Sequence, residues 1–240
     1  MSDEKRVLIL QHIEENPPGR VGDILQENMI PYDNMCVGKD PLPDLSIYHA
    51  LIILGGTQHV YDKDKYPYTA REEAYLHRAI RQEIPCLGLC LGGQLLANAF
   101  GATVMKLPKV HIGFIREHFT EAGKKDPLYK GLPGYQLAFQ WHEDGFALPV
   151  GAVPIAVHED GANQAFRYGR HVYGLQYHVE VTIEMLDTWL HDPSLQKEFV
   201  DMYGVDIYHQ TEREIPHLYP IYHDHSRIMI ENFLRICELL

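Results

Sequence analysis

One cysteine of this chain lies in a setting that is typical of a nucleophile. Cys90 stands between Gly88 and Gly92, directly after the apolar run 86–89 and before the helix-forming run 94–100. This G-x-C-x-G pattern is the cysteine version of the nucleophile elbow, a tight strand-to-helix turn that lifts its central side chain clear of a sheet. Unpaired N–H groups at the start of the helix favour the thiolate, which is the attacking form of cysteine. The pattern by itself also fits a small buried cysteine, so the hypothesis depends on partners elsewhere in the chain.

A cysteine nucleophile needs a base, and the base needs a group that orients it. His178 and Glu180 are separated by one residue in a strand-like segment, so we expect their side chains to share a face. The imidazole can then take the thiol proton and later protonate a leaving amine, while Glu180 accepts a hydrogen bond from its other nitrogen. The alternative that this pair leaves open is an ordinary strand-end histidine beside a solvated carboxylate.

Attack on a carbonyl creates an oxyanion, which needs preorganised N–H donors. Gly55 and Gly56 follow the strongly apolar run 50–54, and glycine allows a close approach of the backbone. The N–H groups of Gly56 and of Leu91, directly after the nucleophile, are the natural pair of donors. A plain strand-to-loop turn is the alternative for the two glycines. Gln94 lies one helical turn beyond the cysteine, where it can hold a polar substrate group or simply bond within the turn.

The composition limits the class of protein. With 45% hydrophobic and 22% charged residues it is that of an ordinary globular protein, and the formal net charge of -12 argues against a nucleic-acid or anionic-membrane partner. The apolar runs are too short to span a membrane, and residues 1–6 lack the apolar core of a signal peptide. The four cysteines show neither disulfide nor zinc spacing, which favours the cytoplasm. The fifteen histidines are scattered without a ligand motif, so we expect no metal and no cofactor.

The elements that must position these residues are predicted from the apolar pattern. Residues 1–105 alternate strands with helices, which is typical of a doubly wound, mostly parallel α/β sheet with helices on both faces. The predicted strands of this part are 6–11, 34–38, 50–54, 86–89 and 102–105, and the predicted helices are 20–29, 69–82 and 94–100. Thr69 and Glu72 have the spacing of a capping box. Active sites of such sheets lie at the carboxyl ends of the strands, where both the glycine pair and the cysteine are expected.

The second half of the chain has a different pattern. Between residues 111 and 180, five strand-like segments are separated by turn residues, which predicts a small antiparallel extension of the sheet. They are 111–119, 136–141, 153–158, 163–167 and 171–179. From residue 182 the chain is helical again, and 224–240 is amphipathic. No linker or repeat interrupts residues 1–240, so we expect a single domain.

Four motifs of this chain resemble the class I (triad-type) glutamine amidotransferases. They are Leu-Gly-Gly-Thr at 54–57, Gly-Leu-Cys-Leu-Gly-Gly-Gln at 88–94, Gln-Trp-His-Glu-Asp at 140–144 and Gly-Leu-Gln-Tyr-His-Val-Glu at 174–180. Leu-Gln-His at 10–12, followed by Pro-Gly at 18–19, is similar to the stand-alone branch related to the amidotransferase domain of GMP synthetase. The matches span nearly the whole chain, and the family implies a flavodoxin-like sheet.

The resemblance implies a specific chemistry. Cys90 attacks the side-chain carboxamide of glutamine, ammonia leaves, and water activated by His178 hydrolyses the resulting γ-glutamyl thioester to glutamate. In this family the segment 141–143 meets the α-amino and α-carboxylate groups of glutamine, largely through its backbone. The substrate-binding residues that we expect are Gly55, Gln94, Trp141, His142 and Glu143.

Two positions depart from the family pattern. Val179 replaces the proline of His-Pro-Glu, which leaves the triad intact, and Glu143 replaces the glycine of His-Gly-Asp, which adds a charge to a substrate-facing loop. The chain carries no P-loop and no synthetase segment, so we expect either a separate ammonia-accepting synthetase subunit or hydrolysis of a small γ-glutamyl substrate. A γ-glutamyl peptidase and a non-catalytic regulatory relative are the alternatives. The segment 203–225 can cover the active-site mouth, form a subunit interface or pack internally.

Overall fold

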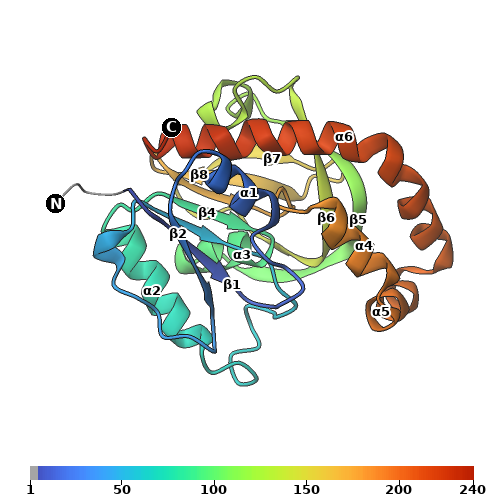
Figure 1. Ribbon diagram of the computed structural model, residues 1–240, viewed down its shortest axis with the longest axis horizontal. Coiled ribbons are helices and arrows are strands. Elements are labelled where there is room, and N and C mark those ends of the chain that lie inside the picture. Colours follow the sequence, from blue (N-terminus) through green and yellow to red (C-terminus); the bar gives the residue numbers. More distant parts are fainter. Residues whose placement is uncertain (1–4) are drawn as a thin grey trace.

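The structure is a computed structural model that describes residues 5–240. Most of the stretch 1–6, which lacks a signal-peptide core, lies outside the described residues. The apolar runs pair into one nine-stranded sheet with the order β2-β1-β3-β4-β9-β8-β7-β5-β6 (Figure 1).

Five strands form the parallel half of this sheet. They are β1 (Val7–Gln11), β2 (Tyr32–Cys36), β3 (Ala50–Ile53), β4 (Cys86–Leu89) and β9 (Val172–Leu175). They pair in parallel with one another in the order β2-β1-β3-β4-β9. The residues of β1, β3, β4 and β9 are all buried, as expected for parallel strands that are covered on both faces. The predicted parallel sheet is therefore confirmed.

Four strands form the antiparallel half. They are β5 (Val104–Phe119), β6 (Tyr135–Phe146), β7 (Val153–Val157) and β8 (Asn163–Tyr168). The prediction that strand 102–105 continues the parallel alternation is wrong, because this segment begins β5, which pairs antiparallel with β6. The place beside β4 is taken by β9, with Gly88 opposite Gly174. This pairing carries the segment after β9 to the end of β4, where Cys90 follows.

Helices cover both faces of the sheet. They are α1 (Gly19–Glu27), α2 (Thr69–Arg81), α3 (Leu91–Ala99), α4 (Ile183–His191), α5 (Pro193–Tyr203) and α6 (Val205–Ile236). In one core α1 and α6 pack against the sheet, and in the other α2 and α3 pack against its opposite face. Figure 1 shows α6 crossing one face as a long helix, with α2 on the other side. The apolar stripe predicted for 224–240 is the end of α6 that enters the first core.

The capping box predicted at the start of α2 is wrong. Thr69 is already the first residue of the helix, and its hydroxyl donates to the Tyr66 carbonyl at 2.8 Å. Glu72 is fully buried instead of capping the helix, and its carboxylate lies 2.9 Å from Nε2 of buried His12. This ion pair links α2 to the segment that follows β1. A contact with a distant part of the chain has thus overridden the local pattern.

The long C-terminal helix α6 contacts the segment that follows β9. In the segment 203–225, Tyr222 is fully buried and its hydroxyl accepts a hydrogen bond from the Val181 N–H at 2.9 Å. Internal packing therefore accounts for part of this segment. Within residues 5–240, none of the helices combines the length and the apolar character that crossing a membrane requires.

Candidate active site

Cys90 occupies a strained turn. It is the single residue between β4 and α3, and its φ of 52° and ψ of −109° form a conformation that side chains rarely adopt. Its N–H donates to the Leu175 carbonyl at 2.9 Å, which ties the turn to the end of β9. The side chain is only 5% exposed and lines a cavity of about 240 Å³.

The glycines of the elbow are required by space. A Cβ on Gly88 would lie 2.4 Å from the backbone carbonyl of Gly92, and a Cβ on Gly92 would lie 2.1 Å from the Ile53 oxygen. Both distances are far below van der Waals contact. Only glycine allows α3 to start this close to β3 and β4, and this closeness places the sulfur at the helix N-terminus.

The structure brings the predicted triad together. Nδ1 of His178 lies 2.7 Å from Oε1 of Glu180, and the second carboxylate oxygen accepts the Val179 N–H at 2.9 Å. His178 and Glu180 are both buried, and His178 shares the cavity with Cys90. The segment has already left β9, and the His178 N–H donates to the Phe139 carbonyl of β6 at 2.9 Å. The predicted contact of His178 with Glu180 is therefore present, although the two residues do not belong to a regular strand.

His178 and Glu180 form a charged pair. Burial lowers the pKa of His178, but the adjacent Glu180 carboxylate and the Cys90 sulfur outweigh this effect and raise it. Burial would raise the pKa of Glu180, but the imidazolium and the hydrogen bonds to the carboxylate lower it. The imidazole is thus held as a cation between two groups that attract it.

The glycine pair lies against the cysteine and the histidine. A Cβ on Gly55 would be 2.8 Å from Cε1 of His178 and 3.4 Å from Cβ of Cys90, and a Cβ on Gly56 would be 3.0 Å from the Leu91 side chain. The Leu91 N–H lies in the first turn of α3, where no intrahelical acceptor exists. The residues expected to form the oxyanion hole are therefore adjacent, and their role remains a prediction.

The predicted substrate-binding residues of α3 and β6 are joined by the Asp144 carbonyl. Nε2 of Gln94 donates to this oxygen at 3.3 Å, and Nδ1 of His142 donates to it at 2.7 Å. Burial and the nearby His111 lower the pKa of His142 to about 3, so its ring is neutral. Because the proton is on Nδ1, Nε2 is a bare acceptor, and it has no partner among residues 5–240.

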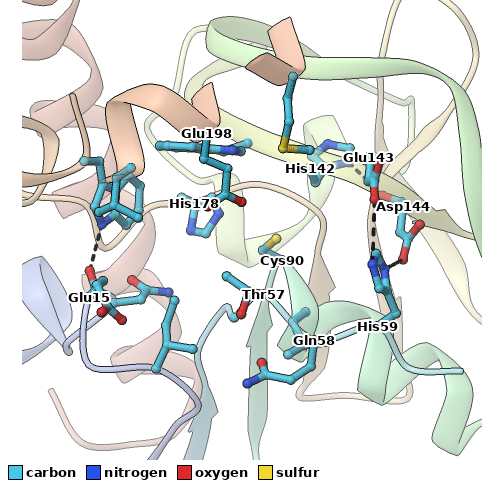
Figure 2. Close-up of a pocket in the computed structure, with 18 of the residues that line it drawn as sticks. Glu15, Thr57, Gln58, His59, Cys90, His142, Glu143, Asp144, His178 and Glu198 are labelled. Atoms are coloured by element: carbon cyan, nitrogen blue, oxygen red, sulfur yellow. Dashed lines mark hydrogen bonds and ion pairs between the residues drawn. The ribbon is translucent and has the colours of Figure 1, made fainter. Parts of the chain in front are cut away.

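The extra charge of Glu143 is compensated. Its carboxylate lies 2.7 Å from Nζ of Lys106 and 3.7 Å from Nε2 of His59, and the neighbouring Asp144 carboxylate lies 2.6 Å from Nδ1 of His59. Figure 2 shows His59 and the two carboxylates together on one side of the cavity. Trp141 also lines the cavity, and it packs edge-on against Trp189 and Phe199.

Comparisons with known proteins agree with this geometry. The family model described as Glutamine amidotransferase class-I matches residues 26–195, which is more than half of the chain. The chain belongs to the class-I glutamine amidotransferase family.

The similar proteins include enzymes and solved structures of this family. The glutamine amidotransferase-like protein YfeJ of Salmonella typhimurium is 29% identical over 178 residues, which are 73% of this chain and 74% of that protein. A glutamine amidotransferase structure from Thermotoga maritima is 28% identical with a TM-score of 0.83, and the alignment covers 98% of this chain and 99% of that one. The glutamine-hydrolyzing GMP synthase of Thermosipho melanesiensis is 35% identical over 135 residues, which are 55% of this chain and only 24% of that enzyme. The fold is thus the flavodoxin-like fold of the glutamine amidotransferases.

One residue that lines this cavity was missed by sequence reasoning. Asn16 lies in the loop after β1, lines the cavity and is only 2% exposed. A Cβ on Gly55 would be 2.9 Å from its Nδ2, which places the amide beside His178 and Cys90. Its Oδ1 has no partner among the described residues. The sequence shows Asn16 only as part of a Pro- and Gly-containing loop, so no local pattern indicated this position.

Two further side chains lie against His178 and Cys90. Trp189 of α4 donates its Nε1–H to the Glu15 carbonyl at 2.8 Å, and its ring packs edge-on against His178. Gln176 places its Nε2 4.0 Å from Sγ of Cys90 and accepts from Gln94 at 3.3 Å. Gln176 lies within one of the recognised motifs, whereas Trp189 could be located only through the fold.

Helix α5 closes one side of the cavity. Glu198, Met202 and Tyr203 of this helix line it together with Cys90 and Trp141. The segment 203–225 therefore contributes its first residue, Tyr203, to the active-site mouth. Figure 2 shows the Glu198 side chain extending from the helix towards Cys90. The sequence predicted a helix here but could not show that it borders the site.

Proposed function

We propose that this protein hydrolyses the γ-carboxamide of glutamine, or of a γ-glutamyl compound, through a thioester on Cys90. The observation that carries the proposal is the strained elbow cysteine in one cavity with His178, whose Nδ1 is held by buried Glu180 at 2.7 Å. Membership of the class-I amidotransferase family supports the same chemistry. Each residue of this arrangement then has a definite role in the two halves of the reaction.

The first half of the reaction forms the thioester. The Cys90 thiolate attacks the γ-carbonyl carbon, and the N–H groups of Gly56 and Leu91 stabilise the oxyanion of the tetrahedral intermediate. The His178 imidazolium gives its proton to the amide nitrogen, the C–N bond breaks, and ammonia or an amine leaves. Glu180 keeps the imidazole oriented throughout and stabilises its charge.

The second half releases glutamate. Neutral His178 takes a proton from water, and the hydroxide attacks the thioester carbonyl. The C–S bond breaks and the Cys90 thiolate is restored beside the imidazolium. In the thioester the Cys90 sulfur carries no negative charge. One of the two groups that raise the pKa of His178 is therefore absent when His178 acts as the base.

The other end of the cavity suits the amino-acid end of glutamine. Gln94 holds the His142–Asp144 segment in place, so that the backbone of 141–143 can meet the α-amino and α-carboxylate groups of glutamine. Glu143 lies at the same end as His142 (Figure 2), and Trp141 also lines the cavity. Gly55 keeps the space beside Cys90 open, because any side chain there would meet His178.

Two fates of the released ammonia or amine are considered, namely transfer to a partner and release into solution. A glutamine-hydrolyzing GMP synthase subunit from Methanococcus maripaludis is 31% identical over 106 residues, which are 43% of this chain and 54% of that protein. This similarity supports a separate synthetase partner that accepts ammonia from the present chain. Release of glutamate without an acceptor, as in a γ-glutamyl peptidase, is the second candidate, favoured by the Glu143 side chain, which lines the cavity where the family pattern has glycine. All four cysteines are free, which supports a reducing, cytoplasmic location.

Product analysis tests the proposal. The purified protein and Cys90→Ala are incubated separately with glutamine and with γ-glutamyl dipeptides, and products are measured by mass spectrometry. We expect glutamate plus ammonia, or glutamate plus the released amine, from the wild type and none from the variant. Ammonia release that persists in a folded Cys90→Ala protein would refute the assignment.

A further inference from the structure

Asn16 is a buried polar side chain at the cavity whose hydrogen-bonding capacity is unused. It is 2% exposed and lines the cavity together with Cys90 and His178. Its Oδ1 is sealed off and has no partner among the described residues, so Nδ2 is the polar atom that this amide presents to the cavity. This Nδ2 donates to no atom within residues 5–240. A buried donor without an acceptor is costly, which indicates that a group entering the cavity accepts its hydrogen bond.

The glycine pair shows where this amide lies. A Cβ on Gly55 would be 2.8 Å from Cε1 of His178 and 2.9 Å from Nδ2 of Asn16. A Cβ on Gly56 would instead be 3.0 Å from the Leu91 side chain. Asn16 therefore lies on the imidazole side of the glycine pair.

Helix α4 holds the amide in this position. The carbonyl of Glu15, the residue before Asn16, accepts the indole N–H of Trp189 at 2.8 Å. The Trp189 ring in turn packs edge-on against His178, with the ring centroids 5.8 Å apart. Figure 2 shows Glu15 and His178 on the same side of Cys90. The loop that carries Asn16 and the imidazole thus have one support in common.

The reaction brings one fitting acceptor to this place. The carboxamide nitrogen of glutamine carries N–H groups and no free lone pair, so it cannot accept from Nδ2 of Asn16. The γ-carbonyl oxygen is bound by the N–H groups of Gly56 and Leu91 in the proposed mechanism. The water of the second half must lie next to His178, which takes its proton, and its oxygen has two lone pairs.

We propose that Asn16 positions the water that hydrolyses the thioester. This inference rests on the proposed thioester chemistry and concerns its second half. One lone pair of the water oxygen accepts the hydrogen bond of Nδ2–H, while one O–H donates to Nε2 of His178. The other lone pair forms the C–O bond to the thioester carbonyl carbon as the proton passes to Nε2. The C–S bond then breaks, the Cys90 thiolate is restored, and glutamate leaves after its new carboxyl group has lost its proton to solvent.

Asn16→Leu tests this role, because leucine has a similar size and no N–H to donate. The rate constant of deacylation should fall about tenfold, which is what one hydrogen bond to a transition state contributes, whereas acylation should be unchanged. Rapid acid quench followed by mass spectrometry of the Cys90 peptide gives both rate constants. Asn16→Ala, which cannot clash with its neighbours, should show the same loss to a smaller extent, since a further water can fill the space.

Hydroxylamine separates this role from a structural one. It attacks the same thioester as a much stronger nucleophile than water, so it depends less on Asn16. The ratio of γ-glutamyl hydroxamate to glutamate does not depend on how much of the protein is folded, and it should rise several-fold in both Asn16 variants. Asn98→Leu is the control, because it removes an amide outside the cavity that donates to Glu73 at 3.2 Å, and it should keep the wild-type ratio.

The outcomes distinguish this inference from the proposed function. Slower deacylation together with a higher hydroxamate-to-glutamate ratio would support the role of Asn16. An unchanged ratio in both variants, or a loss confined to acylation, would overturn that role and leave the thioester chemistry standing. A wild type that cleaves neither glutamine nor γ-glutamyl dipeptides, or that does so without a glutamyl group on Cys90, would refute both.

Discussion

At the scale of single residues, the site depends on the charge that Glu180 places beside His178. Glu180→Gln keeps the shape of the side chain but removes the carboxylate that raises the pKa of the imidazole. If deacylation limits turnover, kcat rises with pH as His178 becomes neutral, so we expect the midpoint of this rise to move to lower pH in the variant. We also expect kcat to fall about 10²-fold or more, but less than in His178→Ala. A pH–kcat profile measures both effects, and a midpoint that stays in place or moves upward would contradict this role of Glu180.

The elbow shows why one added carbon atom can disrupt a site. The Cβ of Gly88→Ala would lie 2.4 Å from backbone atoms of Gly92, which cannot move without displacing α3. We expect a loss of about 3 kcal/mol or more in the free energy of unfolding. Gly161→Ala is the matched control, because its φ is +87° and nothing lies within 4 Å, so only backbone strain of about 1–2 kcal/mol applies. Urea unfolding compares the two variants, and equal losses would show that the close approach at the elbow is unimportant.

At the scale of elements, the site forms because β9 pairs with β4. The motif that contains His178 is 88 residues away from Cys90 in the chain, yet the parallel register of Gly88 with Gly174 delivers it to the same edge of the sheet. The buried pair of His12 and Glu72 secures the neighbouring loop, since a Cβ on Gly56 would lie 2.8 Å from Cβ of His12. Helices α4 and α5 then add one wall of the cavity.

The sequence predicts those residues of the site that belong to short local patterns. Cys90 and the His178–Glu180 pair belong to short local patterns, and the structure places them together. Asn16 carries no local signal, because its position arises from the packing of its loop against α4. The predicted capping box failed for the same reason, since Glu72 has a tertiary partner. Local spacing thus identified the groups that we propose to react, whereas the groups that surround them depend on contacts between distant segments.

At the scale of the whole molecule, Glu117 makes stability depend on pH. Burial, together with the charges of Asp160 and Glu159, raises its pKa to about 7, although the hydrogen bond from Gln140 opposes the shift. The folded state therefore favours the protonated form, so the stability that this group contributes is present below its unfolded pKa of about 4.5 and is lost as pH rises towards 7. Glu117→Gln avoids this loss, and we expect it to exceed the wild type in free energy of unfolding by about 2 kcal/mol at pH 8.

Urea unfolding at two pH values checks this expectation. At pH 5 the wild-type carboxyl is largely protonated in the fold, so the advantage of the variant should fall to about a quarter of its value at pH 8. Glu159→Gln, which changes an exposed carboxylate near this group, serves as the control and should alter stability by less than about 0.5 kcal/mol. A Glu117→Gln variant that is less stable than the wild type at pH 8 would show that the ionised carboxylate is well accommodated.

The central claim is that Cys90 carries the γ-glutamyl group during turnover. The most direct measurement is peptide mass spectrometry of the protein mixed with excess substrate and quenched in acid within the first turnovers. We predict that the peptide containing Cys90 gains the mass of one glutamyl group, that the gain disappears when the substrate is exhausted, and that it is absent in Cys90→Ala. Turnover without any glutamyl group on Cys90, or its accumulation on another residue, would contradict the account.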